Sequence, residues 1–346
     1  MTRWITALAI VAVISIQGFA QTRTMKIAGV TRTYIVHAPS GMSDPPLVFC
    51  LHGYNMDGAS QQSYTQMDKV ADQEKFIVVY PDAINKSWDM SGENDFTFIL
   101  AIIDTIDNQY FIDRNRIYSC GFSQGGFMTF QLACRYSDVF AAIAPTSGNL
   151  TGPCTLERPI SMRLTFGTNE GFTGGTAAFM ENVTKWIALC NCPETPVITR
   201  PYPASNPNSL VTRLYYGPCD GGTEVIADSI RTGGHEWPMN TNDRINNSEE
   251  TWAFLKKFSL PDETPVRHTA IAAVNTAVSA TYNAGVVHLR GVGDACPVRV
   301  LDTKGRQVAD AIVQQHRFAF SGRSSGVYLV QVHRNDRTVT LRVVLP

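Results

Sequence analysis

The stretch that most constrains the fold is RIYSCGFSQGG, at positions 116–126, where a short apolar run leads into a G-x-S-x-G pattern centred on Ser123. This pattern predicts a strand that turns sharply into a helix, so that the Ser123 hydroxyl stands clear of the backbone. The glycines two residues to either side leave room for that turn. The helix would begin beside the serine, so that the Gln124 N–H points at a developing oxyanion. The plainer alternative is a Gly-rich β–α turn with an idle serine.

The apolar pattern around this stretch alternates between strands and helices. Short, fully apolar runs are typical of central parallel strands, and apolar residues at helical spacing mark the segments between them. The expected strands are 31–37, 47–51, 76–80, 117–122, 140–144, 162–166, 211–216 and 224–230, and the expected helices are 62–75, 96–106, 127–135 and 176–189. This alternation predicts an α/β fold with a mostly parallel sheet covered on both faces.

Two later loops offer partners for the serine. Glu170 comes just beyond the strand expected at 162–166, and His235 lies in a Gly-flanked loop beyond the last of these strands. The order Ser123, Glu170, His235 is the Ser…acid…His chain order of the α/β-hydrolases. Ser123 would be the nucleophile and His235 the general base, while Glu170 would hold the imidazole in one tautomer. The alternatives are a loop histidine without a catalytic role and an ordinary exposed carboxylate.

Other residues are candidates for binding the reacting group or the substrate. The second expected strand ends in His52-Gly53-Tyr54, where the Tyr54 N–H is a candidate oxyanion donor beside that of Gln124. We interpret His52 as a structural residue that orients this loop. Trp88 and Trp237 are possible substrate-binding platforms for an aromatic acyl group or a sugar ring, with core packing an equal alternative.

The N-terminus has the features of a secretory signal peptide. Arg3 supplies a positive start, residues 4–16 are almost all apolar, and small residues stand at 18 and 20. We expect a signal peptide over residues 1–20, cut after Ala20. A membrane anchor is the alternative, but the apolar run is short for a bilayer span.

Export makes the cysteines informative. The chain has 8 of them, and an even number in an oxidising compartment favours disulfides, although spacing leaves the pairing open. Cys190 and Cys192 lack the further close ligands that a metal site needs. Cys50 and Cys120 fall in expected core strands, which indicates buried thiols.

Composition sets limits on partners. The net charge is −1, so no nucleic acid or other polyanion is implied, and the hydrophobic fraction of 44% suffices for a packed core. The length of 346 residues favours one large domain and a smaller one. No metal or organic cofactor is implied, because the expected triad needs none.

Four segments taken together carry a family resemblance: LHGYNMDG, VVYPDA, RIYSCGFSQGGFMTFQLACRYSDVFAAIAPTSG and GGHEWP. With them the chain resembles, over residues 25–260, the secreted esterases that group polyhydroxybutyrate depolymerase-like proteins with feruloyl and acetylxylan esterases of carbohydrate esterase family one. The resemblance implies an α/β-hydrolase fold with Ser123, Glu170 and His235 as the triad and Tyr54 as an oxyanion donor.

The resemblance also implies a Cys192–Cys219 disulfide, with Cys134–Cys154 as a further pairing. The sequence departs from the family pattern at the acid. The family usually carries Asp in a His-Gly-Thr-x-Asp segment, whereas this chain has Glu170 followed by a shorter loop. Two reserve acids, Asp220 and Asp228, fit the family position poorly.

The C-terminal region reads as a separate unit. A linker is expected at 261–270, and alternating or apolar runs over 271–346 predict a small antiparallel β-sandwich. The segments VRVLDTKGRQV and SSGVYLVQV resemble the C-terminal sorting domain of the type IX secretion system, which implies that secretion machinery as a partner, export across an outer membrane, and release or attachment at the cell surface. A carbohydrate-binding or spacer sandwich is the alternative.

The sequence therefore predicts a secreted serine carboxylesterase that acts through an acyl-enzyme on feruloyl or acetyl esters of plant polysaccharide such as xylan. A depolymerase of polyhydroxyalkanoate and a serine peptidase of the same fold are rival enzymes. A catalytically inactive surface protein that binds carbohydrate is the rival of another class.

Overall fold

The computed structural model describes residues 20–239, 242–261, 279–283, 286–290, 296–302, 306–314, 317–320, 326–334 and 337–345. The expected signal peptide, apart from Ala20, and nearly all of the expected linker lie outside these residues. Within the described part of the chain, no helix is long and apolar enough to cross a membrane.

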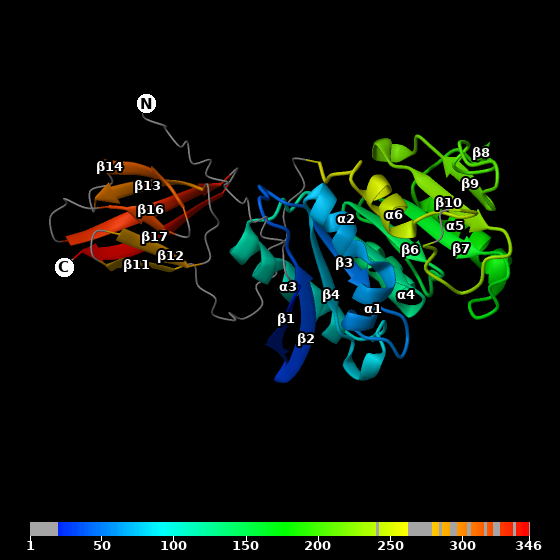
Figure 1. The fold of residues 1–346 in the computed structure, drawn as a ribbon, viewed down its shortest axis with the longest axis horizontal. Helices are drawn as coiled ribbons and strands as arrows, with labels where there is room; N and C mark the ends of the chain where they lie inside the picture. Colours follow the sequence, from blue (N-terminus) through cyan, green and yellow to red (C-terminus); the bar gives the residue numbers. More distant parts are fainter. Residues whose placement is uncertain are drawn as a thin grey trace, which may run out of the picture.

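One sheet runs through the first unit, with strands in the order β1-β2-β4-β3-β5-β6-β7-β10-β9-β8 (Figure 1). Neighbours from β4 to β10 pair in parallel, and antiparallel strands extend the sheet at both ends. The strands are β1 (Gln21–Ile27), β2 (Val30–His37), β3 (Leu47–Leu51), β4 (Ile77–Pro81), β5 (Ile117–Phe122), β6 (Ala142–Thr146), β7 (Ser161–Gly167), β8 (Val197–Thr199), β9 (Val211–Tyr216) and β10 (Val225–Ile230). The mostly parallel sheet predicted from the sequence is confirmed.

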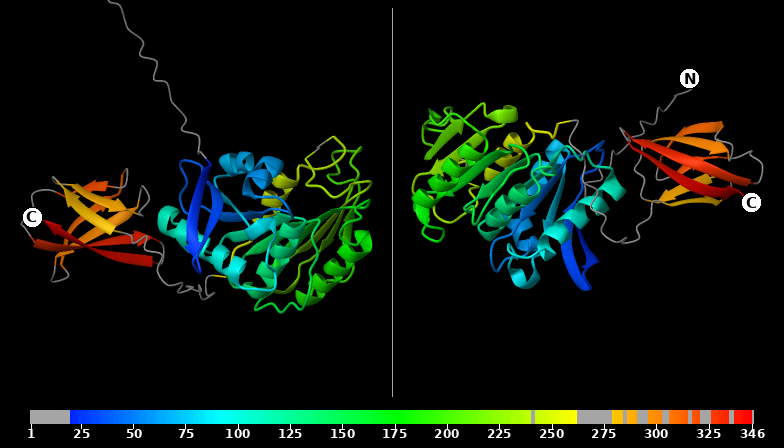
Figure 2. Two further views of the ribbon diagram at one scale, coloured as in Figure 1. Left: turned by 90° about the horizontal axis from the view of Figure 1, so that it is seen from below. Right: turned by 180° about the vertical axis from the view of Figure 1, so that it is seen from behind.

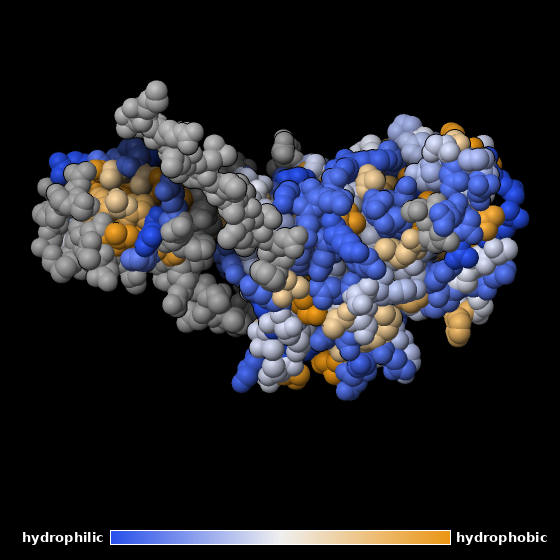
Figure 3. Space-filling view, in the orientation of Figure 1, coloured by the Kyte–Doolittle hydropathy of each residue, from blue (hydrophilic) through white to orange (hydrophobic). Residues whose placement is uncertain are grey.

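Helices cover both faces of this sheet (Figures 1 and 2). They are α1 (Gly58–Thr65), α2 (Met67–Glu74), α3 (Asn94–Tyr110), α4 (Gln124–Arg135), α5 (Gly175–Leu189) and α6 (Asn247–Leu255). Along β3, Phe49 packs in one hydrophobic cluster with α3, α4 and α5, while Val48 packs in another with α2 and α6. This alternation within one fully buried strand is what a sheet covered on both sides requires. The face seen in Figure 3 is largely hydrophilic, with small scattered hydrophobic patches.

The helices differ from the expectation in two regions of the chain. The segment 62–75 forms two helices rather than one, because Gln66 between them has a φ of 50° and interrupts the helical path. The helix α6 was not anticipated. Its start is marked by Asn246, whose side chain accepts from the N–H groups of Ser248 and Glu249, as a helix N-cap does.

Two disulfides join segments that are distant in the sequence. Cys134 in the last turn of α4 bonds Cys154 in the loop after β6, and Cys192 after α5 bonds Cys219 between β9 and β10. Both pairings implied by the family resemblance are confirmed. The thiols of β3 and β5, at positions 50 and 120, are free and buried as expected.

The C-terminal residues form two small antiparallel sheets. One has the order β11-β12-β15 and the other β14-β13-β16-β17. A single hydrophobic cluster includes Val287 of the first sheet with Val300 and Val330 of the second. The strands are β11 (Ser279–Asn283), β12 (Val286–Arg290), β13 (Pro297–Asp302), β14 (Gln307–Ile312), β15 (Arg317–Ala319), β16 (Gly326–Arg334) and β17 (Arg337–Leu345).

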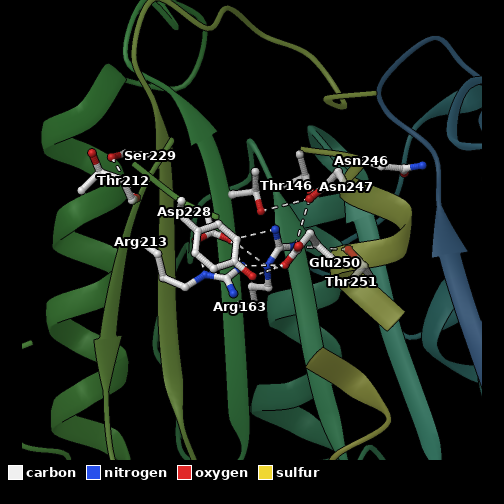
Figure 4. Close-up of polar contacts among 12 residues, drawn as sticks. Thr146, Arg163, Thr212, Arg213, Asp228, Ser229, Asn246, Asn247, Glu250 and Thr251 are labelled. Carbon is white, nitrogen blue, oxygen red and sulfur yellow. Dashed lines mark hydrogen bonds and ion pairs between the residues drawn. The ribbon is translucent and has the colours of Figure 1, made fainter. Parts of the chain in front are cut away.

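A buried ion network ties α6 to the sheet (Figure 4). The fully buried carboxylate of Asp228 in β10 accepts from Arg163 Nε of β7 at 2.8 Å and from Arg213 Nε of β9 at 2.7 Å. Arg213 also pairs with Glu250 of α6 at 2.9 Å. Burial alone would raise the pKa of Asp228, but the charges and hydrogen bonds of the two arginines hold that pKa below its usual value.

We predict that Asp228→Asn lowers the free energy of unfolding by about 3–5 kcal/mol, because the buried Arg163 guanidinium loses its counter-charge. Denaturant titration of the purified chain measures this loss. The matched control is Glu181→Gln, which breaks a solvent-exposed pair with Lys185 and should leave the unfolding midpoint in place. Equal midpoint shifts for the two variants would show that the network does not hold the sheet together.

Candidate active site

Ser123 occupies a sharp turn between β5 and α4. Its φ of 56° and ψ of −120° lie outside the usual regions for a residue with a side chain. The Ser123 N–H donates to the Thr146 carbonyl of β6 at 2.9 Å, and the Phe127 N–H donates to the Ser123 carbonyl at 3.1 Å. The backbone is thereby fixed on both sides of the serine, in the strand–turn–helix geometry that the sequence motif predicts.

The glycines of the motif are required by close backbone contacts. A Cβ on Gly125 would lie 2.2 Å from the Leu51 carbonyl oxygen at the end of β3. A Cβ on Gly121 would lie 2.4 Å from the Gly125 carbonyl oxygen. Neither position has room for a side chain, so the helix can begin this close to the sheet only with glycine there.

The expected oxyanion donors lie around the serine. Gln124 is the first residue of α4, so its N–H precedes the first intrahelical hydrogen bond. A Cβ on Gly53 would lie 3.4 Å from Ser123 Cβ, which places the loop carrying Tyr54 directly against the serine. The next N–H group, that of Asn55, donates to the Lys86 carbonyl at 3.0 Å. Tyr54 and Gln124 therefore remain our candidates for the oxyanion hole.

His52 holds this loop in place. Its Nε2 accepts from the Ala83 N–H at 3.0 Å, so the proton is on Nδ1, which donates to the Gly53 carbonyl at 2.7 Å. Burial lowers the pKa of His52, although nearby hydrogen bonding and carboxylates oppose that effect. A neutral, fully hydrogen-bonded imidazole matches the structural role that we inferred from the sequence.

The structure brings Glu170 and His235 together. Glu170 Oε1 pairs with His235 Nδ1, and it also accepts from the Thr173 hydroxyl at 3.0 Å. The Glu170 side chain has no exposed surface, while that of His235 keeps 18%. A carboxylate on Nδ1 holds the proton there and leaves Nε2 free to act as a base. The Phe122 ring, in the residue before the serine, lies 4.8 Å from the His235 ring.

The acid and histidine loops are joined through their backbones. They follow β7 and β10, which are parallel neighbours. The Asn169 N–H donates to the Gly233 carbonyl at 2.9 Å, and the Thr232 N–H donates to the Thr168 hydroxyl at 2.9 Å. Because the carboxyl ends of parallel neighbours meet at one edge, this arrangement places the two side chains in contact.

Two tryptophans expected to bind substrate are interior residues, which corrects that expectation. Trp88 is 3% exposed and Trp237 is 2% exposed. The Trp88 indole N–H donates to the His52 carbonyl at 2.8 Å, and that of Trp237 donates to the Ser248 hydroxyl at 3.0 Å. Neither ring presents a face to a substrate, so both serve the packing role held open as the alternative.

Neither reserve acid contacts the histidine. Asp228 belongs to the buried arginine network, and Asp220 is an exposed residue that accepts from the Asn191 side chain at 3.1 Å. Glu170 is thus the carboxylate that the structure pairs with His235.

Sequence reasoning missed Phe172, which follows the acid by two residues. Its side chain is 86% exposed and its ring lies 5.3 Å from that of His235. The signal available was an aromatic residue between glycines beside the expected acid. It also missed Thr173, the hydroxyl donor to Glu170.

A family model described as Esterase PHB depolymerase matches residues 32–159, which include the serine turn. A bifunctional acetylxylan esterase/xylanase of Neocallimastix patriciarum is 31% identical over 239 residues, covering 67% of this chain and 34% of the relative. The chain belongs to the family of polyhydroxybutyrate depolymerase-like and feruloyl esterases. Feruloyl esterase D of Neurospora crassa is 27% identical over 257 residues, covering 69% of this chain and 86% of the relative.

One solved structure has a similar fold. An acetyl xylan esterase from Aspergillus awamori superimposes with a TM-score of 0.55 at 16% sequence identity, covering 69% of this chain and 99% of that chain. This likeness supports the α/β-hydrolase fold of the first unit. The chain spans only about a third of the length of the Neocallimastix relative, which carries a second activity.

We predict that Glu170→Gln lowers kcat for an activated ester by up to about 10⁴-fold, because an amide no longer holds the imidazole in the productive tautomer. The measurement is steady-state hydrolysis of p-nitrophenyl acetate by the purified chain. Asp220→Asn is the matched control and should keep wild-type turnover. The acid is misassigned if the effects of the two variants are reversed.

Proposed function

We propose that this protein is a secreted serine carboxylesterase that hydrolyses feruloyl or acetyl esters on plant polysaccharide such as xylan. The observation that carries the proposal is the pairing of Glu170 with His235 beside the strained turn of Ser123. The feruloyl and acetylxylan esterases among the relatives support this substrate class.

In the proposed reaction, His235 Nε2 removes the Ser123 proton while the serine oxygen attacks the ester carbonyl carbon. The oxyanion that forms is held by the N–H groups of Gln124 and Tyr54. Glu170 stabilises the imidazolium through Nδ1. Collapse of this intermediate breaks the ester C–O bond, and the imidazolium gives its proton to the departing alcohol oxygen, leaving an acyl-enzyme.

Water completes the cycle. His235 removes a proton from a water molecule, whose oxygen attacks the acyl carbon, and the same two N–H groups hold the second oxyanion. Release of the carboxylic acid returns the proton to Ser123. Every proton transfer uses the one imidazole whose position Glu170 fixes.

A polyhydroxyalkanoate substrate is the second candidate, favoured by the matching family model, whose description names PHB depolymerase. The same triad chemistry would serve a polyester. An inactive carbohydrate-binding role is disfavoured, because a purely binding protein has no need for a buried carboxylate paired with a loop histidine.

For the C-terminal region we propose a small β-sandwich that acts as a sorting domain for type IX secretion, without a catalytic role. The two sheets that share one hydrophobic cluster support the sandwich. The proposed boundaries are a signal peptide at 1–20, a catalytic domain at 25–260, a linker at 261–270 and the sorting domain at 271–346.

We predict that Ser123→Ala reduces ester turnover by about 10⁶-fold, as loss of the nucleophile does in serine hydrolases, while the protein stays folded. Hydrolysis of methyl ferulate, acetylated xylan and hydroxybutyrate oligomers by wild-type enzyme identifies the substrate, and circular dichroism checks the fold. Unchanged turnover in this variant would refute the nucleophile. Preference for hydroxybutyrate oligomers would replace the polysaccharide proposal by the polyester one.

We further predict that Phe172→Ala lowers kcat/KM about 3–10-fold for methyl ferulate but not for p-nitrophenyl acetate, because an aromatic pair contributes about 0.5–1.5 kcal/mol beyond area burial. The exposed ring beside His235 would stack on the aromatic acyl group. Val197→Ala, at an exposed apolar residue of β8, is the control and should leave both substrates unaffected. Equal losses on both substrates would count against an acyl-binding role.

A further inference from the structure

Asn247 is a fully buried polar residue, 0% exposed, at the start of α6. Its side-chain Nδ2 donates to the Thr146 hydroxyl at 2.9 Å, and its Oδ1 accepts from Arg163 Nη1 at 3.0 Å and from the Thr165 hydroxyl at 3.2 Å. Its backbone N–H donates to the Pro238 carbonyl at 2.8 Å. One residue thus joins β6, β7 and the loop before α6 (Figure 4).

Three of these partners, Thr146, Thr165 and Pro238, lie in or against a segment that carries one member of the proposed triad. The carbonyl of Thr146 accepts the Ser123 N–H at 2.9 Å. The strand β7, which contains Thr165, runs directly into the turn that carries Glu170. Pro238 follows His235 within the same short loop. The contacts of Asn247 therefore converge on the three segments whose relative positions determine the triad geometry.

The amide group is suited to this place by its chemistry. The Arg163 guanidinium can only donate, so the amide oxygen must face it, and the amide nitrogen then faces Thr146. An apolar side chain of similar size would satisfy none of these groups. The buried Arg163 therefore sets the orientation of the Asn247 amide. Arg163 Nη2 in turn pairs with Asp228 Oδ2 at 2.7 Å.

The start of α6 holds the histidine loop at a second point. The Ser248 hydroxyl accepts from the Trp237 indole at 3.0 Å and donates to the Thr65 carbonyl at 2.6 Å. Two successive residues of α6 thus fix two successive residues of the loop, Trp237 and Pro238, which follow His235 after one intervening residue. A loop restrained in this way leaves its histidine little freedom to move away from the serine.

We propose that Asn247 is a positioning residue, which acts through Thr146, β7 and Pro238 to keep Ser123, Glu170 and His235 in reacting geometry. This inference rests on the proposed esterase function. Misplacement of a reacting group by about 1 Å costs on the order of 10²-fold in rate. Loss of the Asn247 side chain should therefore lower the rate of the chemical step more than the affinity for substrate.

The main test compares Asn247→Leu with Thr251→Val in the full chain, using p-nitrophenyl acetate below the unfolding temperature of each. Thr251 is buried and approaches the same Arg163 atom at 3.4 Å, but it does not join the triad segments. We expect kcat to fall about 10–100-fold for Asn247→Leu with KM within about threefold. Thr251→Val should stay within about twofold of wild type, since it shares the network but not the links.

A second variant keeps the test decisive if Asn247→Leu folds poorly. Thr146→Val removes only the hydroxyl that Asn247 contacts and keeps the carbonyl that accepts the Ser123 N–H. It should lower kcat about tenfold and slow the labelling of Ser123 by a fluorophosphonate to the same degree. In the double variant Asn247→Leu/Thr146→Val, the fold loss in kcat should be smaller than the product of the two single losses, because both substitutions remove the same Asn247–Thr146 hydrogen bond.

The outcomes separate the inference from the function on which it rests. A folded Asn247→Leu or Thr146→Val variant with near wild-type kcat would overturn the positioning role, as would an equal loss in Thr251→Val or fully multiplicative losses in the double variant. If those variants are active and only Ser123→Ala is inactive, the esterase function stands and the inference fails. An inactive wild-type enzyme would overturn both.

Discussion

The close approach of α4 to the end of β3 is the constraint on which the site depends. Gly125 lies so near the Leu51 carbonyl that no side chain fits there, and Ser123, at the turn into α4, has a positive φ. The same contact places the serine against the loop of Tyr54 and at the start of a helix, where free N–H groups are found. The close approach of α4 to β3 thus places the candidate nucleophile beside the candidate oxyanion donors. The loops of His235 and Glu170 then have to bring the imidazole to the serine.

The strands at the centre of the sheet could be predicted where each is a short, fully buried and largely apolar run, as at Leu47–Leu51 and Ile117–Phe122. Ser123 and His235 are candidates from the sequence because glycines stand close to both. Burial is a tertiary property, so the interior positions of Trp88 and Trp237 could not be read from a sequence in which both stand in polar loops. The helix α6 escaped prediction because Asn247, Ser248 and Thr251 on its buried side are polar, and they join a network that only the folded chain assembles.

The buried ion network of Asp228, Arg163 and Arg213 has an energetic cost and a structural use. Burying Arg163 and Asp228 costs desolvation energy, which their attraction must offset before the pair adds to stability, so such a pair is weak support for stability alone. Its directional donors and acceptors, however, fix the amide of Asn247 in one orientation, which an apolar core would not do. The interior beneath the site therefore gives a defined arrangement to the strands and loops that carry the proposed triad.

The acid side of the site directs a buried charge at one partner. Glu170 lies in the turn that follows β7, and its carboxylate reaches His235 Nδ1 from there. Thr173 and His235 both bind Oε1, while Oε2 is buried without a hydrogen-bond partner among the described residues. The negative charge is thus shielded from water and directed at a single imidazole, where it stabilises the imidazolium more than an exposed carboxylate would.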